Sequence, residues 1–242
     1  RRKWPKAKYS KFWAPDDTVN FMLTFGDNPS ELVVGAHYDA VPNAPGANDN
    51  GAAVVQLMEV AYLLDQLRLM GQQEPNVTIC FWDHEEIFGS KYMGSKLFLK
   101  TRSPKQAIVV DVSGIGEAYV SDSDEVGLFP DLPVRKTPPS DNMNFQISGV
   151  PVTLICALPP DQLRDKKPAA WDTMHTKKDA IDIIDPDTMA QMPWVILDAI
   201  ALNEQLNARE PEIDEDEEAF FSGLSFEAGS ETHSCPCGGT LS

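Results

Sequence analysis

The sequence predicts an α/β fold with three layers, in which a mostly parallel, mixed central sheet carries helices on both faces. Short apolar runs such as residues 32–34 lack the polar alternation of a half-exposed strand, so they suit strands covered on both faces. These runs alternate with segments of helical periodicity such as residues 52–69, an order that is typical of parallel sheets. A chain of 242 residues is long enough to build one such domain.

Each element of that fold has its own signal in the sequence. We predict strands and helices in the following order: strands at residues 19–25, 32–34, 77–82, 107–112 and 152–157, and helices at residues 52–69, 92–100 and from 186 onward. The first helix has apolar side chains at helical spacing and is followed by Gly71 as a stop. Asp185 and Pro186 open the last helix. Residues 113–148 are rich in Gly, Pro, Ser and Asp without a long period, so we expect loops over the active-site edge.

The two ends of the chain carry opposite charge. Six Arg and Lys side chains lie within the first 11 residues, and seven Asp and Glu side chains lie between residues 210 and 218. We therefore expect an irregular basic lead-in at residues 1–16, a single domain at residues 17–208 and a flexible acidic tail at residues 209–242. A basic docking arm is the alternative interpretation of the lead-in.

The composition excludes some classes of function. A formal net charge of −17 argues against a nucleic-acid partner, because neutralising phosphates needs clustered Lys and Arg. We find no apolar leader of a signal peptide and no apolar stretch of 18 residues, so we expect no membrane partner. The chain begins with Arg1 rather than Met and can be a trimmed form, so its compartment and oligomeric state stay open.

The four cysteines carry little functional signal. Cys80 and Cys156 lie in apolar runs and are predicted to be core thiols. Cys235 and Cys237 in the tail have CxC spacing, without a second pair to complete a tetrahedral zinc site. None of the four lies at a predicted helix start or among cationic neighbours, so a cysteine nucleophile is not expected.

Polar side chains follow three of the predicted strands at the point where each strand ends. His37 follows the second strand, Glu85 and Glu86 follow the third, and Asp111 ends the fourth. Ligands of open α/β sheets bind outside the carboxyl ends of the strands, so we expect these side chains to meet there. Each of them alone is more often a solvated loop residue, and only their convergence carries the prediction.

The segment HYDAVPNAPGANDNG at residues 37–51 carries the most specific signal. Asp39 lies two residues after His37 and would fix the imidazole by accepting its second N–H. Asp49 lies in a glycine-bounded loop at a helix start, where it could bind a metal ion. The alternative interpretation makes Asp49 a helix N-cap, which is a common use of Asp.

The adjacent carboxylates of Glu85 and Glu86 suit a division of labour between a metal ion and the water beside it. One would bind the ion, and the other would accept the proton of the attacking water as a general base. An HExxH zinc motif starting at His84 would require His at position 88, where Phe88 stands. A GxSxG nucleophile elbow, a P-loop and a dinucleotide fingerprint are also absent from the sequence.

These motifs together resemble the M28 family of zinc metallopeptidases, which contains bacterial aminopeptidases and has glutaminyl cyclase as a more distant relative. The resemblance runs from about residue 33 to residue 206. It rests on VVGAHYDAVPNAPGANDNGAA, FWDHEEIFGSKYMGS, AIVVDVS, SDNMNFQISGVP and MHTKKDAIDIIDP. It implies the phosphorylase/hydrolase-like architecture of zinc exopeptidases and a peptide or amino-acid-derivative substrate.

The resemblance also implies roles for individual residues. Two Zn²⁺ ions would be bound. His37 and Asp111 would bind one ion, Glu86 and His175 would bind the other, and Asp49 would bridge both. Glu85 would be the general base, Asp39 would support His37, and a bridging water would attack the N-terminal peptide bond. Thr176 and Asp179 match the HTxxD setting of the family motif and would hold the His175 loop.

Two other functions fit the same residues. One is a glutaminyl-cyclase-like aminoacyltransferase with a single zinc ion, and the other is a non-catalytic binding module on the same fold. We favour the aminopeptidase because the sequence retains every ligand position and Glu85. For the specificity pocket we expect the loops around Met143, Phe145 and Trp171, each of which could equally be a core residue.

Overall fold

The computed structural model describes residues 8–13, 18–28, 31–87 and 89–208, with side chains described from residue 18 onward. The chain divides into two compact units, Arg1–Asn207 and Ala208–Ser242, and the described strands and helices all lie in the first unit. The predicted acidic tail and its two cysteines lie outside the described residues.

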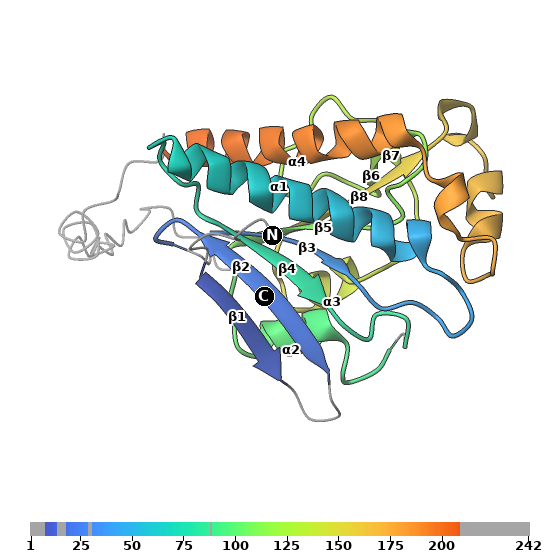
Figure 1. Ribbon diagram of the computed structural model, residues 1–242, viewed down its shortest axis with the longest axis horizontal. Helices are drawn as coiled ribbons and strands as arrows, with labels where there is room; N and C mark the ends of the chain where they lie inside the picture. Colours follow the sequence, from blue (N-terminus) through green and yellow to red (C-terminus); the bar gives the residue numbers. More distant parts are fainter. Residues whose placement is uncertain (1–7, 14–17, 29–30, 88, 209–242) are drawn as a thin grey trace, which may run out of the picture. The chain divides into compact units, whose positions relative to one another are not determined.

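The described part of the first unit has three layers around one eight-stranded sheet, as the sequence predicted (Figure 1). The strands are β1 (Lys8–Trp13), β2 (Val19–Phe25), β3 (Leu32–His37), β4 (Val77–Trp82), β5 (Gln106–Val110), β6 (Glu117–Ser121), β7 (Val134–Arg135) and β8 (Val152–Leu158). Their order across the sheet is β1-β2-β4-β3-β5-β8-β6-β7. The four central strands β4, β3, β5 and β8 are parallel, while β2 and β6 flank them in antiparallel pairing.

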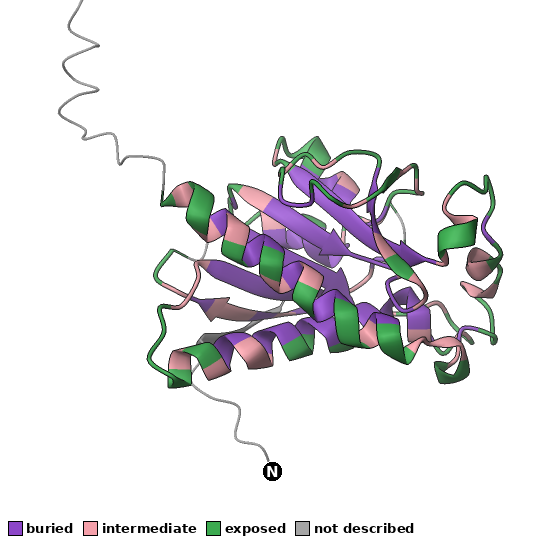
Figure 2. Ribbon diagram, turned by 90° about the horizontal axis from the view of Figure 1, so that it is seen from above, coloured by how far each residue is buried: buried purple, intermediate pink, exposed green. Residues whose placement is uncertain are grey.

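Helices cover both faces of this sheet. The long helices α1 (Ala52–Leu69) and α4 (Pro186–Asn207) lie side by side on one face, and the short helices α2 (Gly94–Leu99) and α3 (Asn142–Ile147) lie on the other (Figure 1). Figure 2 shows that the buried residues of α1 and α4 face the sheet. Each face has its own apolar core, and Cys80 and Cys156 are buried free thiols as predicted. No helix in the described part of the chain is long and apolar enough to cross a membrane.

The central strands are held in register by close packing around Trp82. All six residues of β3 and of β4 are buried, and His37 pairs with Trp82 at the ends of the two strands. A Cβ on Gly35 would lie 2.3 Å from the Trp82 ring, so only glycine leaves room for the indole there. Phe145 packs against the same ring at a centroid distance of 5.5 Å and has no exposed surface. The core interpretation of Phe145 is therefore correct, and its predicted place in a specificity pocket is wrong.

Two segments are more regular than the sequence predicted. Part of the irregular lead-in expected at residues 1–16 is the strand β1, which pairs with β2 at the edge of the sheet. Its sequence KYSKFW combines aromatic residues, which favour strands, with lysines, which are common on edge strands. The expected loops at residues 113–148 contain β6, β7 and α3. These elements have two to six residues, which is too short to show a hydrophobic period.

Candidate active site

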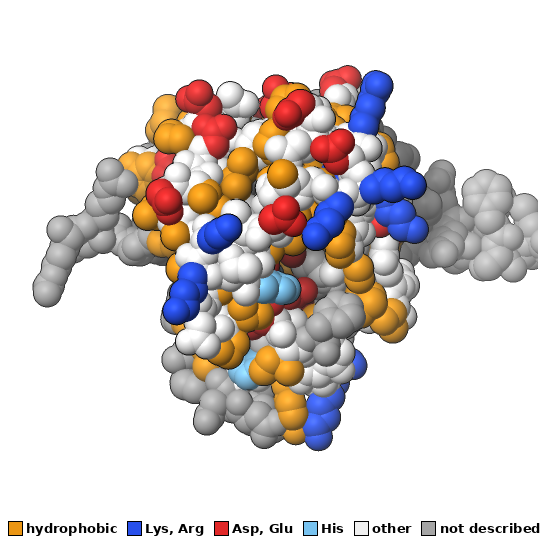
Figure 3. Space-filling view, turned by 90° about the vertical axis from the view of Figure 1, so that its right-hand side faces the viewer, with side chains coloured by type: hydrophobic (Ala, Val, Ile, Leu, Met, Phe, Trp, Pro, Cys, Tyr) orange, Lys and Arg blue, Asp and Glu red, His pale blue; other side chains and the backbone are white. Residues whose placement is uncertain are grey.

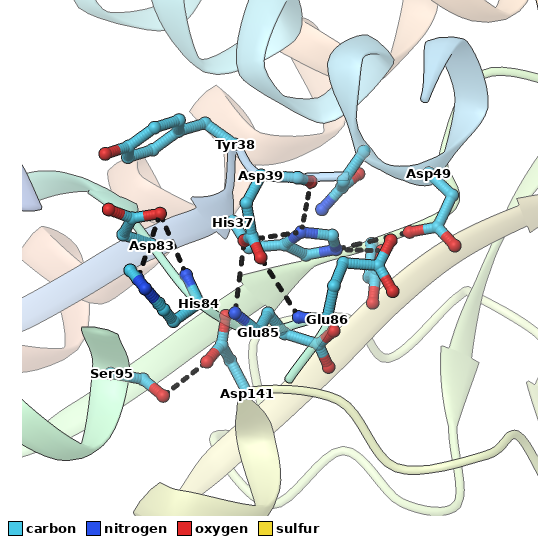
Figure 4. A network of polar contacts seen from close by, with 12 residues as sticks. His37, Tyr38, Asp39, Asp49, Asp83, His84, Glu85, Glu86, Ser95 and Asp141 are labelled. Atoms are coloured by element: carbon cyan, nitrogen blue, oxygen red, sulfur yellow. Dashed lines mark hydrogen bonds and ion pairs between the residues drawn. The ribbon is translucent and has the colours of Figure 1, made fainter. Parts of the chain in front are cut away.

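The ends of the central strands bring the predicted residues together at one edge of the sheet. His37 is the last residue of β3, Asp111 directly follows β5, and Glu85 and Glu86 follow β4. Asp49 comes from the turn Ala47–Gly51 before α1, and His175 follows the turn Ala169–Thr173. Figure 4 shows His37, Asp49, Glu85 and Glu86 pointing toward one another.

Within the described residues these side chains form two groups that could each hold a metal ion. In the inner group, His37 Nε2 lies 3.3 Å from Asp49 Oδ1 and 3.4 Å from Asp111 Oδ1. In the outer group, His175 Nε2 lies 3.1 Å from Asp49 Oδ2 and 3.1 Å from Glu86 Oε2. Asp49 therefore contributes one carboxylate oxygen to each group.

The residues present fit zinc in both donor type and spacing. Imidazole nitrogen and carboxylate oxygen are ordinary zinc ligands, and tetrahedral bonds of about 2.0–2.2 Å place ligand atoms about 3.3–3.6 Å apart. The separations of 3.1–3.4 Å in the two groups are close to that range. His37 Nε2, Glu86 Oε1 and Asp111 Oδ1 are buried without a hydrogen-bond partner, which a cation would correct.

The local backbone excludes the N-cap interpretation of Asp49. The N-cap of α1 is Gly51, and no side chain makes a capping hydrogen bond there. Asp49 itself has non-helical dihedral angles of φ −117° and ψ 82°. Its carboxylate is instead directed toward the two histidines, at 3.3 Å and 3.1 Å.

Asp39 links the inner histidine to the glutamate pair. His37 Nδ1 lies 3.1 Å from the backbone oxygen and 3.4 Å from the carboxylate of Asp39. The two oxygens of that carboxylate accept hydrogen bonds from the backbone N–H groups of Glu85 and Glu86, each at 3.1 Å (Figure 4). Burial acts to raise the pKa of Asp39, but His37 and these N–H groups lower it overall. The contact of Asp39 with the N–H groups of Glu85 and Glu86 was not expected, because the sequence shows only that Asp39 lies two residues after His37.

Asp179 holds the loop that carries Asp49. Its carboxylate accepts the N–H groups of Asn48 at 2.6 Å and Asp49 at 3.1 Å, and its carbonyl accepts that of Ala47 at 3.2 Å. The side chain of Asp179 is fully buried. From the sequence we expected Thr176 and Asp179 to hold the His175 loop, and the structure shows that Asp179 also binds the turn that carries Asp49.

The acidic residues are crowded enough to oppose one another's ionisation. Burial raises the pKa of Glu85 to about 9, and the charges of Asp111 and Asp141 add to this shift. Burial also raises the pKa of Glu86 to about 7. At His37, burial lowers the pKa, but Asp111, Asp39 and Asp49 together raise it well above its ordinary value. Such a cluster holds more acid than it can ionise without added positive charge, which favours a cation.

Asp141 is a buried acid beneath this cluster that the motif analysis did not assign. It directly precedes α3, and one oxygen accepts a hydrogen bond from the Ser95 hydroxyl (Figure 4). Its other oxygen is buried without a hydrogen-bond partner, and burial raises the pKa of Asp141 to about 7. Asp141 is also one of the charges that raise the pKa of Glu85.

A cavity of about 220 Å³ opens beside the two groups. Part of its lining is polar and includes the acids of both groups, Glu85 and His175. The rest of the lining is largely apolar, with Pro138, Leu154, Trp171 and Met174 among its residues. Figure 3 shows histidine and acidic side chains together in a hollow on one face. Trp171 thus lines the pocket as expected, whereas Met143 is not among the lining residues.

Comparison with known families identifies part of the chain. Residues 19–121 match the family model described as peptidase family M28. This M28 segment covers 103 of the 242 residues. The M28 segment contains six of the seven predicted site residues, since only His175 lies beyond it. The resemblance inferred from the motifs is confirmed.

Curated relatives of the M28 segment are aminopeptidases. The chain is 29% identical over 113 residues to aminopeptidase Y of Saccharomyces cerevisiae, which covers 43% of this chain and 20% of the yeast protein. It is 36% identical over 76 residues to the probable lipoprotein aminopeptidase LpqL of Mycobacterium tuberculosis, which covers 31% of this chain and 14% of that protein. The matches thus span a fifth or less of the length of these relatives.

Solved structures share the fold over a larger part of the chain. A zinc aminopeptidase of Bacillus subtilis aligns with a TM-score of 0.59 at 20% identity, covering 75% of this chain and 49% of that one. LapB of Legionella pneumophila aligns with a TM-score of 0.62 at 23% identity, and the alignment covers 83% of this chain and 59% of LapB. Glutaminyl cyclase of Bacteroides thetaiotaomicron, bound to N-acetylhistamine, aligns with a TM-score of 0.60 at 18% identity. This alignment covers 80% of our chain and 83% of the cyclase. These similarities confirm the predicted fold class.

Proposed function

We propose that this protein is a zinc-dependent exopeptidase of the aminopeptidase type, which hydrolyses the N-terminal peptide bond of peptides. The observation that carries the proposal is the pair of adjoining ligand groups that share Asp49. Glu85 lies beside them as a carboxylate that belongs to neither group, and the M28 segment and its aminopeptidase relatives support the same function.

The inner group of His37, Asp49 and Asp111 would hold one zinc ion, and the outer group of Asp49, Glu86 and His175 would hold a second. Zinc at these positions would supply Lewis acidity toward a substrate carbonyl and lower the pKa of a water molecule toward about 7. Glu85 is the general base of the proposal: it accepts the proton of the attacking water and returns it to the leaving amine.

The cavity suits a substrate that enters by its N-terminus. Its acidic residues offer negative charge to a free α-amine, and its apolar residues offer a surface for one side chain. A volume of about 220 Å³ lies below the range of about 300–1,000 Å³ of pockets that enclose drug-sized ligands. A single terminal residue fits such a space better than the middle of a peptide, which favours an exopeptidase.

A metal analysis combined with a substrate panel tests this proposal. The purified protein is loaded with two equivalents of zinc and assayed with aminoacyl-4-nitroanilides and dipeptides, with N-acetylated forms of the same substrates as controls. We expect two bound ions per chain and cleavage of the free-amine substrates only. Two bound ions without cleavage of any panel member would overturn the proposal.

Glutaminyl cyclase activity is a second candidate, because the alignment covers a larger share of a solved cyclase than of a solved zinc aminopeptidase. The alignment covers 83% of the Bacteroides cyclase but only 49% of the Bacillus zinc aminopeptidase. A cyclase-like protein would bind one zinc ion per chain and convert an N-terminal glutamine to pyroglutamate with release of ammonia. Measurement of ammonia from a glutaminyl peptide, together with the zinc count, separates the two candidates.

A further inference from the structure

Part of the apolar wall of the cavity lies on the loop between β8 and His175, which contacts Arg135 of β7. The wall residues Trp171 and Met174 lie within or next to the turn Ala169–Thr173, immediately before His175. This loop has few buried side chains of its own, and its position therefore depends on contacts with neighbouring elements. Arg135 makes several of these contacts.

Arg135 binds the loop at three points. Its guanidinium lies over the ring of Trp171, 4.5 Å from the centroid. Nη1 donates a hydrogen bond to the carbonyl of Gln162 at 3.3 Å, and Nη2 donates one to the carbonyl of Asp165 at 2.5 Å. The Gln162 side chain in turn accepts the N–H of Ala170 at 2.9 Å. The start of the loop and the indole are thus fixed to one side chain.

These contacts use the properties in which arginine differs from lysine. A planar guanidinium can stack on an aromatic ring while its separate N–H groups donate to different carbonyls. Among the described residues no carboxylate forms an ion pair with Arg135. Its charge is therefore directed at the loop carbonyls and at Trp171. The neighbouring Lys136 is exposed and makes no such contact within the described structure.

We propose that Trp171 determines the specificity of the cavity for apolar N-terminal side chains, and that Arg135 is the residue that positions Trp171. This inference rests on the proposed aminopeptidase function and adds a substrate class to it. Thr137, two residues after Arg135 and just beyond β7, also lines the cavity, so the support and part of the lining come from one short segment. Large apolar side chains would pack against the indole, whereas small ones would leave that contact unmade.

Four variants test the proposal, with zinc content measured for each. Trp171→Ala removes the wall, and Arg135→Gln removes its support. Arg135→Lys keeps the charge but loses the planar stack, and Lys136→Gln is the matched control for loss of one positive charge. The readout is the ratio of kcat/KM for leucyl-4-nitroanilide to that for alanyl-4-nitroanilide.

We expect Trp171→Ala to lower this ratio about tenfold or more, the scale by which pockets discriminate apolar groups. Arg135→Gln and Arg135→Lys should each lower it about two- to fivefold, which corresponds to one cation–π contact at a partly exposed site. Lys136→Gln should leave it unchanged. If both Arg135 variants keep the wild-type ratio, or if they lose zinc and activity on both substrates equally, Arg135 has no positioning role toward Trp171.

A binding measurement separates failure of this inference from failure of the proposed function. The affinities of the zinc-loaded protein for free L-leucine and L-alanine are measured by calorimetry, which requires no turnover. If the wild type cleaves nothing but binds L-leucine better, and Trp171→Ala removes the difference, the pocket is correct and the hydrolytic function is wrong. If the wild type cleaves both substrates and Trp171→Ala leaves the ratio and both affinities unchanged, the pocket assignment is wrong and the function stands.

Discussion

The two candidate metal-binding groups share Asp49 but differ in their access to solvent and in their support. The side chain of His37 in the inner group is 1% exposed, whereas that of His175 in the outer group is 58% exposed. The inner histidine also faces Asp39 through its second nitrogen. The described residues offer His175 only the two carboxylates of its own group.

This difference indicates a division of roles between the two groups. A closed and supported set of ligands holds its ion tightly, and an open set leaves room for a substrate. We therefore expect the inner group to keep its ion under conditions in which the outer group exchanges.

Loss of Asp49 should weaken metal binding by both groups, because each group contains one oxygen of the Asp49 carboxylate. We expect Asp49→Ala to reduce zinc from two ions per chain to none under mild chelation and to abolish peptidase activity. Elemental analysis after gel filtration measures the count, with the exposed Asp182→Ala as a control for loss of one charge. Retention of one tightly bound ion would show that Asp49 belongs to a single group.

Glu85 should affect chemistry without affecting either group, because it is a ligand of neither. We expect Glu85→Gln to keep the zinc content of the wild type and to lower kcat about 10²–10⁴-fold, the usual contribution of a general base. Steady-state kinetics on the best substrate of the panel measures this loss. A non-catalytic binding module would show no wild-type activity to lose, and a variant that lost zinc would show Glu85 to be a ligand.

The inner group was more visible in the sequence than the cavity wall. His37 and Asp111 stand directly at the ends of apolar strands, and parallel strands deliver their ends to one edge of the sheet. That geometry follows from the strand pattern alone. The fold class could be predicted for the same reason, because long elements show their period clearly.

The sequence did not predict how the apolar wall of the cavity and the Asp49 turn are held in place, because this depends on contacts between short segments that are distant in the chain. Arg135 lies on a two-residue strand and reaches a loop about 30 residues later, which no local pattern encodes. Asp179 contacts a turn about 130 residues earlier. For Phe145 the sequence offered both pocket and core, and only the packing against Trp82 decides between them.

Asp39 should distinguish the inner group from the outer one. We expect Asp39→Asn to weaken the tighter of the two zinc sites about 10–100-fold, as is usual when the hydrogen-bond partner of a metal-binding histidine is changed. Competition with a chromophoric chelator measures the two affinities separately. Equal weakening of both sites would show that Asp39 acts mainly through the N–H groups of Glu85 and Glu86 rather than through His37.

The metal-free protein should lose stability as the pH rises, and zinc should reverse this trend. The folded-state pKa values of His37, Glu85 and Glu86 all lie above their ordinary values, so these groups favour the folded state when protonated. Their contribution is complete below the ordinary glutamate pKa of 4.5 and is lost as the pH rises toward about 9.

Zinc needs its ligands His37 and Glu86 deprotonated, and its charge also favours the deprotonated form of the neighbouring Glu85. Zinc binding should therefore release protons and should stabilise the protein more at pH 8.5 than at pH 6. Thermal unfolding between pH 5 and pH 9, with chelator or with zinc, measures both trends. Glu85→Gln should flatten the metal-free slope in the upper part of this range, because it removes a carboxyl group whose pKa is raised to about 9. A metal-free melting temperature that rises across the range would show that the acids of the two groups ionise without a cation, and the argument from crowding would fail.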